Sequence, residues 1–156
     1  MTGHMNAFLG IDPGGAGGIA VISTDYATSC PMLMAGDAVD GAAIARWIAH
    51  FGKINLCAIE LNGAMPGQGV SSMFKFGLRT GVVIGIVQAL QIPLIMVRPQ
   101  AWKKRILAGQ PHDKAGAISW CRSRYPEVAL VLPRCRTPHD GMADALCLAE
   151  YARVFT

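Results

Sequence analysis

Four acidic residues lie at positions where an unpaired carboxylate would be destabilising, either because it is desolvated or because it is close to another carboxylate. Asp12 follows the apolar run 8–11, and Glu60 closes the largely apolar run 54–59. A carboxylate beside a buried strand is expensive to desolvate, so it is usually hydrogen-bonded to a turn or bound to a cation. Asp140 and Asp144 are four residues apart, which places both on one helical face, where like charges repel. These positions are therefore candidate ligands for a cation.

A site built from four carboxylates has a defined chemistry. Hard oxygen ligands suit Mg²⁺ or Mn²⁺ rather than zinc, and two such ions can activate a water and stabilise the leaving oxygen of a phosphodiester. Simpler interpretations stay open, with Asp12 as a turn residue, Asp140 as a helix cap and Asp144 as a solvated side chain. Asp144 fits the last of these poorly, because apolar residues surround it in the sequence.

The elements that must position these acids follow from hydrophobic spacing and turn residues. The predicted strands are 8–11, 17–22, 31–34, 54–60 and 93–97, with a turn at 13–16. The predicted helices are 37–51, 70–90, a short segment opened by Pro99, 114–125 and 137–151. Strands alternate with helices, so we expect one α/β domain over residues 6–156. Neighbouring parallel strands would place Asp12 and Glu60 side by side.

Three other segments bear on the site. In the last helix Thr137 suits the N-cap, Pro138 the first turn and Asp140 the capping-box acid. The helix 70–90 carries three glycines four residues apart, which allow close approach either within the chain or across a dimer. These glycines are Gly77, Gly81 and Gly85. The loop 62–69, rich in glycine and proline beside Glu60, is predicted to contact a substrate.

The composition of the chain limits its expected binding partners and cellular location. Nine of the 14 basic residues but only two of the ten acids lie between residues 98 and 136, which favours a polyanionic partner for this segment. The five cysteines form no C-x-x-C pair, so a zinc ribbon or disulfide framework is not indicated and a cytoplasmic location is expected. Glutamines and a proline interrupt the apolar stretch 80–97, so no membrane partner is expected. Gly3-His4-Met5 resembles a cloning scar, and residues 1–5 are excluded from the fold.

Two motifs carry a resemblance to a known family. G-I-D-P-G at 10–14, the strand-end Glu60 and D-G-M-A-D-A-L at 140–146 resemble the RuvC-type Holliday-junction resolvases, especially phage-encoded members. The resemblance implies an RNase H-like fold with a mixed five-stranded sheet flanked by helices, and a homodimer in which the helix 70–90 is the dimer helix. It also implies Mg²⁺-dependent nicking of two opposed strands, with Mn²⁺ as a substitute ion, at a four-way DNA junction.

The same resemblance assigns roles to individual residues. It implies Asp12, Glu60 and Asp144 as metal ligands. Many bacterial members place the third acid three residues before the last, where this chain has Gly141, so Asp140 or His139 must fill that position. Lys114 and Lys103, or Lys104 in place of Lys103, are implied to assist catalysis or grip the scissile phosphate. The expected DNA contacts are Lys104, Arg105, Lys75, Arg79 and Met65, the last as an apolar wedge.

Other functions share parts of this pattern. An RNA–DNA hybrid nuclease or a nuclease of broader branched or flap DNA would use the same acids on the same fold. A junction-binding protein without activity is a further alternative, which intact acids at all four positions disfavour. A dinucleotide-binding fold fits worse, because Gly15 to Gly18 precede a strand pattern rather than a helix.

Overall fold

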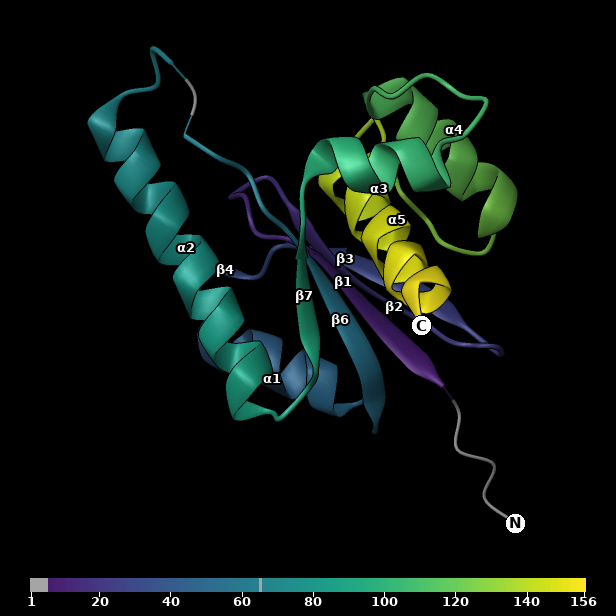
Figure 1. Cartoon of the computed structure of the whole chain (residues 1–156), viewed down its shortest axis with the longest axis horizontal. Helices are drawn as coiled ribbons and strands as arrows, with labels where there is room; N and C mark the ends of the chain where they lie inside the picture. The colour runs from purple at the N-terminus through teal and green to yellow at the C-terminus, as the bar shows by residue number, and fades with distance from the viewer. Residues whose placement is uncertain (1–5, 65) are drawn as a thin grey trace.

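The computed structural model describes residues 6–64 and 66–156 and contains one five-stranded sheet with helices on both faces (Figure 1). The strand order is β3-β2-β1-β6-β7, where β1–β2 and β2–β3 are antiparallel and β1–β6 and β6–β7 are parallel. This mixed sheet confirms the predicted α/β fold. The strands are β1 (Ala7–Asp12), β2 (Gly18–Ile22), β3 (Ala27–Pro31), β6 (Ile54–Glu60) and β7 (Leu94–Val97), with a separate ribbon of β4 (Met34–Ala35) and β5 (Ala38–Val39).

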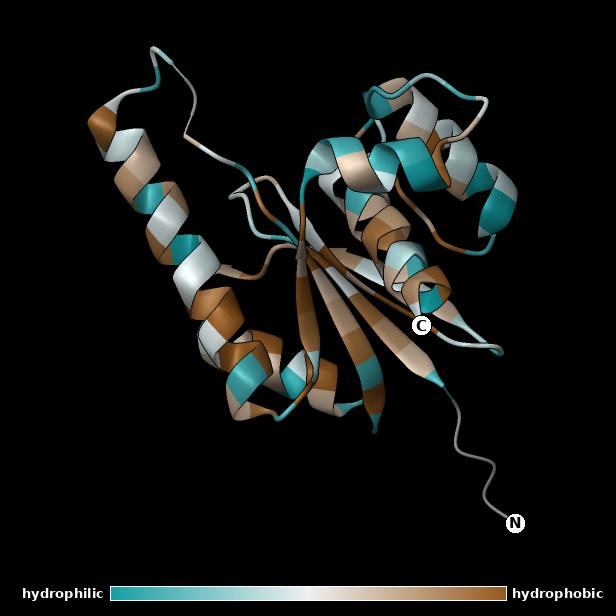
Figure 2. Ribbon diagram, viewed as in Figure 1, coloured by the Kyte–Doolittle hydropathy of each residue, from teal (hydrophilic) through white to brown (hydrophobic). Residues whose placement is uncertain are grey.

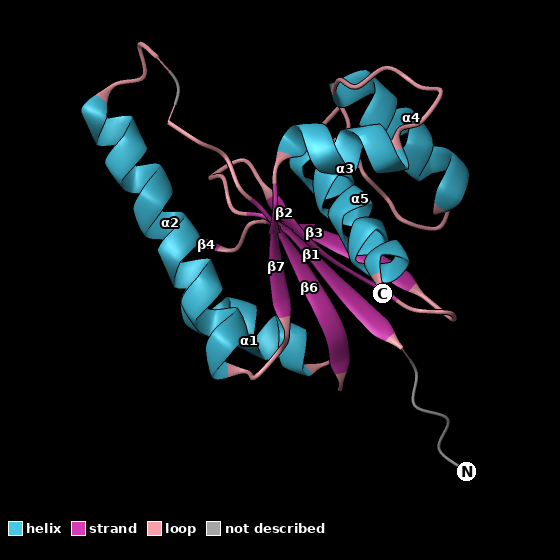
Figure 3. Ribbon diagram, viewed as in Figure 1, coloured by secondary structure: helices cyan, strands magenta, loops and turns pink. Residues whose placement is uncertain are grey.

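Within the described part of the chain, five helices cover the two faces of the sheet (Figure 3). Alternating residues of the central strand divide the core, because successive strand side chains point to opposite faces. Phe8 packs with the cluster under three of the helices, and Leu9 and Ile11 pack with the cluster under the other two. The first group is α3 (Pro99–Ile106), α4 (Lys114–Arg124) and α5 (Asp140–Phe155), and the second is α1 (Gly41–Ala49) and α2 (Val70–Ala89).

Helix α5 lies directly against the sheet. A Cβ atom built on Gly10 of β1 would stand 2.0 Å from the Ala145 carbonyl oxygen and 2.3 Å from the Ala149 nitrogen. One on Gly18 of β2 would stand 2.6 Å from the Gly141 carbonyl oxygen. Only glycine permits such an approach of helix and strand backbones. The beginning of α5 is therefore held against β1 and β2.

Helix α2 is arranged differently. It extends away from the sheet beyond α1, and its outward side carries apolar residues (Figures 1 and 2). Val70, Phe74 and Leu78 are 83, 71 and 57% exposed. Among the described residues, a Cβ on Gly77, Gly81 or Gly85 would meet nothing within 4 Å, so the alternative that these glycines pack within the chain is wrong.

By length and composition alone, α2 is also apolar enough to cross a membrane. It has 20 residues with a mean hydropathy of 1.4 over the most apolar window. A single helix of this kind is weak support for a membrane span. In addition, Lys75 and Arg79 lie within the helix, and charged side chains are costly in the centre of a membrane.

Several predicted boundaries were wrong, among them the end of the last helix, which lies at Phe155 rather than 151, and three of the differences have a clear physical reason. The third strand is Ala27–Pro31 rather than 31–34, because the chain pairs with β2 before residue 31 and then turns into the β4–β5 ribbon. Helix α1 begins at Gly41 rather than 37, since the Asp40 carboxylate accepts from the Ala43 nitrogen at 2.9 Å and caps the helix there. In α5 the N-cap is His139 and not Thr137, so Pro138 lies outside the helix.

Candidate functional site

The sheet brings two of the predicted acids together. Ile11 of β1 is the register partner of Ile59 in parallel β6, so Asp12 and Glu60 follow as the last residues of adjacent strands. The first turns of α5 lie against this same end of the sheet and carry Asp140 and Asp144. The predicted juxtaposition of strand-end acids with the helical acid pair is thus present in the structure.

The charges of this group act on one another. Burial, and then the neighbouring Glu60, raise the pKa of Asp12 from 3.8 to about 6, although a hydrogen bond from the Gly14 nitrogen at 3.2 Å opposes the shift. Burial, and then Asp12 and Glu60, raise the pKa of Asp144 to about 7. A carboxyl whose pKa is raised by other carboxylates gains from a nearby cation. Lys103 of α3 supplies a weaker effect of that kind on both aspartates.

Glu60 is held by two neutral hydrogen-bond donors. Its side chain is buried, its Oε1 accepts from Asn62 Nδ2 at 2.7 Å, and its Oε2 accepts from Trp102 Nε1 at 2.7 Å. Sequence reasoning missed both partners. Asn62 was placed only in a loop and Trp102 only on a short helix, and no spacing rule links Trp102 to an acid 42 residues earlier.

Asp140 has a different partner. Lys114 Nζ lies 2.5 Å from Asp140 Oδ2, and this ammonium lowers the pKa of Asp140 while the carboxylate raises the pKa of Lys114. Lys114 reaches the site because it is the first residue of α4, whose N-cap Asp113 accepts from the Gly116 nitrogen at 2.8 Å. His139 Nδ1 accepts from the Met142 nitrogen at 3.2 Å, so its ring is engaged in capping α5.

The fold matches solved structures over almost its whole length. RuvC of Thermus thermophilus in complex with a Holliday junction substrate aligns with a TM-score of 0.65 at 18% identity, covering 92% of this chain and 90% of that one. A second Thermus thermophilus RuvC structure aligns with a TM-score of 0.62 at 20% identity, covering 96% and 97%. The chain has a RuvC-like fold. No family model matches the sequence, and no curated protein is significantly similar to it.

The RuvC-like fold confirms the predicted fold and the resemblance to RuvC. The particular resemblance to phage-encoded members stays a prediction. One local feature explains the departure at residue 141. A Cβ on Gly141 would stand 2.2 Å from the Ala16 carbonyl oxygen and 2.6 Å from Gly17. No acidic side chain fits at 141 without moving α5 from the turn, so within the first turn of α5 the carboxylate comes from Asp140, one residue earlier.

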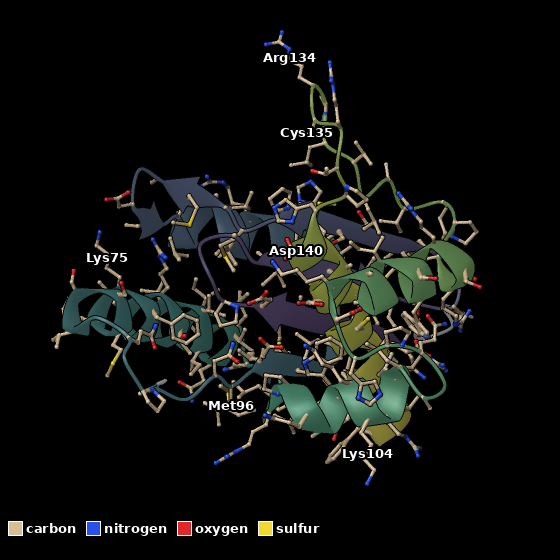
Figure 4. All side chains as sticks on the ribbon, turned by 90° about the horizontal axis from the view of Figure 1, so that it is seen from above. Lys75, Met96, Lys104, Arg134, Cys135 and Asp140 are labelled. Carbon is tan, nitrogen blue, oxygen red and sulfur yellow. The ribbon has the colours of Figure 1, made fainter. Side chains whose placement is uncertain are left out.

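The residues predicted to contact DNA lie in different surroundings. Lys104 and Arg105 are exposed in the last turn of α3, and Lys104 points away from Asp140 (Figure 4). Lys75 Nζ is 3.7 Å from Asp37 Oδ2 in an exposed pair. Met65 lies outside the described residues.

Arg79 reaches from α2 toward the turn that follows Asp12. Its Nη2 donates to the Asp37 carbonyl at 3.1 Å, and a Cβ on Gly15 would be 2.7 Å from its Nη1. This side chain ties α2 to the turn between β4 and β5 and lies close to Gly15 in the β1–β2 turn. Elsewhere on α2, a groove of about 750 Å³ between α2 and the start of α3 is lined by Leu61, Asn62 and Arg98, among others.

The donor set suits a hard divalent cation by its chemistry. It is made of carboxylate oxygens, and burial followed by mutual repulsion raises the pKa of Asp12 and Asp144, a cost that a cation would relieve. Within residues 6–64 and 66–156, no three histidine, cysteine or acidic side chains already converge enough to hold an ion. Asp140 forms an ion pair with Lys114, and Glu60 accepts hydrogen bonds from Trp102 and Asn62. Each of these two acids therefore already has partners.

Proposed function

We propose that this chain is a metal-dependent endodeoxyribonuclease that resolves four-way DNA junctions by paired symmetric nicks. The observation that carries the proposal is the gathering of Asp12, Glu60 and Asp144 at one end of a RuvC-like sheet, with charges that act on one another. The excess of basic residues between 98 and 136 supports a polyanionic substrate.

The residues divide the work of hydrolysis between them. Asp12, Glu60, Asp144 and Asp140 would hold Mg²⁺, or Mn²⁺ in its place, which supplies an activated water and stabilises the leaving oxygen when bound. Lys114 is largely exposed at the edge of the acids, and its Nζ can pass from the Asp140 carboxylate to a phosphate oxygen of the scissile strand. Lys103 offers a second ammonium next to Asp12 and Asp144.

We further propose that the active form is a homodimer in the cytoplasm. Each chain has one group of four acids, whereas paired nicks on opposed strands need two such groups held in a fixed relation. The outward face of α2 offers the surface, because Val70, Phe74 and Leu78 follow one another at four-residue spacing and are largely exposed. A contiguous apolar face of this kind typically marks an interface.

Cleavage of a labelled synthetic four-way junction tests the activity. The assay compares Mg²⁺, Mn²⁺ and EDTA, and it includes linear duplex, flap and RNA–DNA hybrid substrates. Symmetric nicks on the junction alone, with Asp12→Asn inactive, are the expected result. Preferred cleavage of the flap or hybrid would transfer the proposal to those substrates, and tight binding with no cleavage would favour a non-catalytic junction-binding protein.

The oligomeric state tests the dimer. Phe74→Glu should convert a dimer to a monomer in light scattering after size exclusion. Phe155→Glu is a matched control, because Phe155 is similarly exposed, at 60%, but lies at the far end of α5. A monomeric wild-type protein, or equal effects of the two changes, would contradict the assignment of α2.

A further inference from the structure

Both oxygens of the Glu60 carboxylate accept a hydrogen bond from an uncharged donor. Asn62 Nδ2 and Trp102 Nε1 lie 2.7 Å from Oε1 and Oε2 respectively. An indole N–H is a single donor with a fixed direction, and each carboxylate oxygen keeps a further lone pair after accepting one bond. The two donors therefore orient the carboxylate without using up its capacity to bind elsewhere.

The two donors differ in how firmly they are held. Trp102 has no exposed surface and packs in the core beneath α3 and α5, so its indole N–H cannot turn to water. Asn62 is exposed and follows Glu60 by two residues in the loop after β6. The tryptophan is thus the rigid member of the pair, and the hydrogen bond that it makes is itself buried.

Glu60 needs such support because its neighbours repel it. Asp12 and Asp144 both feel its negative charge, and a glutamate side chain has three rotatable bonds through which to move away. Two successive residues of helix α3 oppose this repulsion. Trp102 holds the carboxylate directly, and Lys103 places its ammonium 5.4 Å from the centroid of the Trp102 ring and near the two aspartates.

We propose that Trp102, assisted by Asn62, is a positioning residue that keeps the Glu60 carboxylate directed toward Asp12 and Asp144 for binding of a divalent cation. This inference rests on the proposed nuclease function. Trp102 touches neither substrate nor cation in this role and acts only through Glu60. Partners of this kind around a metal ligand typically change metal affinity or activity by about 10–100-fold when removed.

The decisive variant is Trp102→Phe, which keeps an aromatic ring in the core and deletes the N–H. Trp120→Phe is the matched control, because it removes an indole from the same side of the sheet and contacts only the Tyr125 ring among the aromatic residues described. Asn62→Leu removes the second donor from an exposed position, so it decides the question if Trp102→Phe fails to fold. Circular dichroism establishes that each variant is folded.

The primary measurement uses no DNA. The chain has three tryptophans, so a ¹⁵N–¹H spectrum shows three indole signals, and Trp102→Phe identifies one of them. Titration with Mg²⁺ should shift the Trp102 signal and leave the Trp120 signal in place, and Glu60→Gln should abolish that shift. Free Mn²⁺ measured by electron paramagnetic resonance should then show about 10–100-fold weaker binding to Trp102→Phe, and about tenfold weaker binding to Asn62→Leu.

Cleavage completes the test. Trp102→Phe should cut the junction about 10–100-fold more slowly at a fixed, subsaturating Mg²⁺ concentration, with recovery at higher Mg²⁺ and unchanged junction binding in EDTA. If wild-type protein cleaves and binds Mn²⁺ but Trp102→Phe behaves like Trp120→Phe, the positioning role is wrong and the nuclease function stands. If wild-type protein neither binds Mn²⁺ nor cleaves any DNA, the proposed function itself fails, and the inference fails with it.

Discussion

Glycines on the two sides of the sheet have opposite surroundings. On the α5 side, Gly10 and Gly141 lie so close to a neighbouring backbone that an added Cβ would come within 2.0 and 2.2 Å of a carbonyl oxygen. On the α2 side, the added Cβ atoms of Gly77, Gly81 and Gly85 would meet no described atom within 4 Å. The same residue type therefore serves close packing inside the chain in one region and leaves an open face in the other.

The difference separates two tasks. Close packing of α5 fixes the distance between the acids of the sheet and those of the helix, and repulsion among these acids is tolerated because the backbone cannot relax away from it. Helix α2 contributes little to the core of its own chain, because Val83 and Val87 are its only buried residues. Its open face contributes neither of them. We expect changes on the α5 side to affect activity and stability and changes on the outer α2 face to affect association.

The largest expected effect lies at the acids themselves. Asp12→Asn or Glu60→Gln should lower junction cleavage at least about a hundredfold, because a ligand for the cation is lost. Binding of the junction in EDTA should be unchanged or stronger, because one negative charge near the phosphates is gone. Cleavage and gel-shift assays on the same preparations measure both. Equal loss of binding and cleavage would show that these acids maintain the structure rather than the chemistry.

The next effect distinguishes the two kinds of glycine directly. Gly10→Ala should lower the free energy of unfolding by about 3 kcal/mol or more, because the added methyl group forces α5 away from β1. Gly85→Ala, whose Cβ would meet nothing within 4 Å among the described residues, is the control and should be neutral or stabilising. Urea unfolding of both variants gives the comparison, and similar losses would mean that the α5 contact is looser than described.

The acids make stability depend on pH on the α5 side. Folding raises the pKa of Asp12 to about 6 and that of Asp144 to about 7, so the folded state binds more protons than the unfolded state between about pH 4 and 7. The free energy of unfolding in EDTA should therefore fall as pH rises from 5 to 8, by on the order of 4 kcal/mol. Asp144→Asn should flatten this dependence. A rise of stability over the same range would contradict the burial and mutual repulsion of these acids.

The smallest expected effect lies on the open face. Gly81→Ala should stabilise the isolated chain by about 0.5–1 kcal/mol, since alanine favours a helix more than glycine does. If α2 pairs with a second copy, the same methyl group should weaken association. Thermal unfolding of Gly81→Ala in a monomeric Phe74→Glu background measures its effect on the stability of the isolated chain. Sedimentation of Gly81→Ala alone measures its effect on association. Unaltered association would place the interface elsewhere.

Much of the fold could be predicted because its signals are local. Apolar runs that end on Asp12 and Glu60 predict strands with acids at one edge, and the order of strands and helices predicts an α/β sheet. The edge strand Ala27–Pro31 was misplaced because all five of its residues are half-buried and its composition lacks a strong apolar alternation. His139 was overlooked as a cap because a threonine two residues earlier matched the usual preference.

The contacts that tune the site could not be predicted from spacing. The hydrogen bond from Trp102 to Glu60 joins residues 42 positions apart through the β6–β7–α3 arrangement, and the Lys114–Asp140 pair depends on how α4 packs on α5. Arg79 resembles a surface cation in the sequence, yet it ties α2 to the β4–β5 turn and lies close to Gly15 after Asp12. Each of these requires the tertiary path of the chain, which one sequence does not encode as a local pattern.

The contact at Gly141 also bears on how relatives of this chain can be recognised. Because the turn after β1 fills the space where a side chain at 141 would lie, the two acids at the start of α5 are spaced D-x₃-D, and the shorter D-x₂-D spacing, which would need an acid at 141, is sterically blocked. A search pattern written strictly around the shorter spacing would pass over such chains. A pattern that accepts either spacing, provided that glycine follows the first acid of the longer form, would retain them.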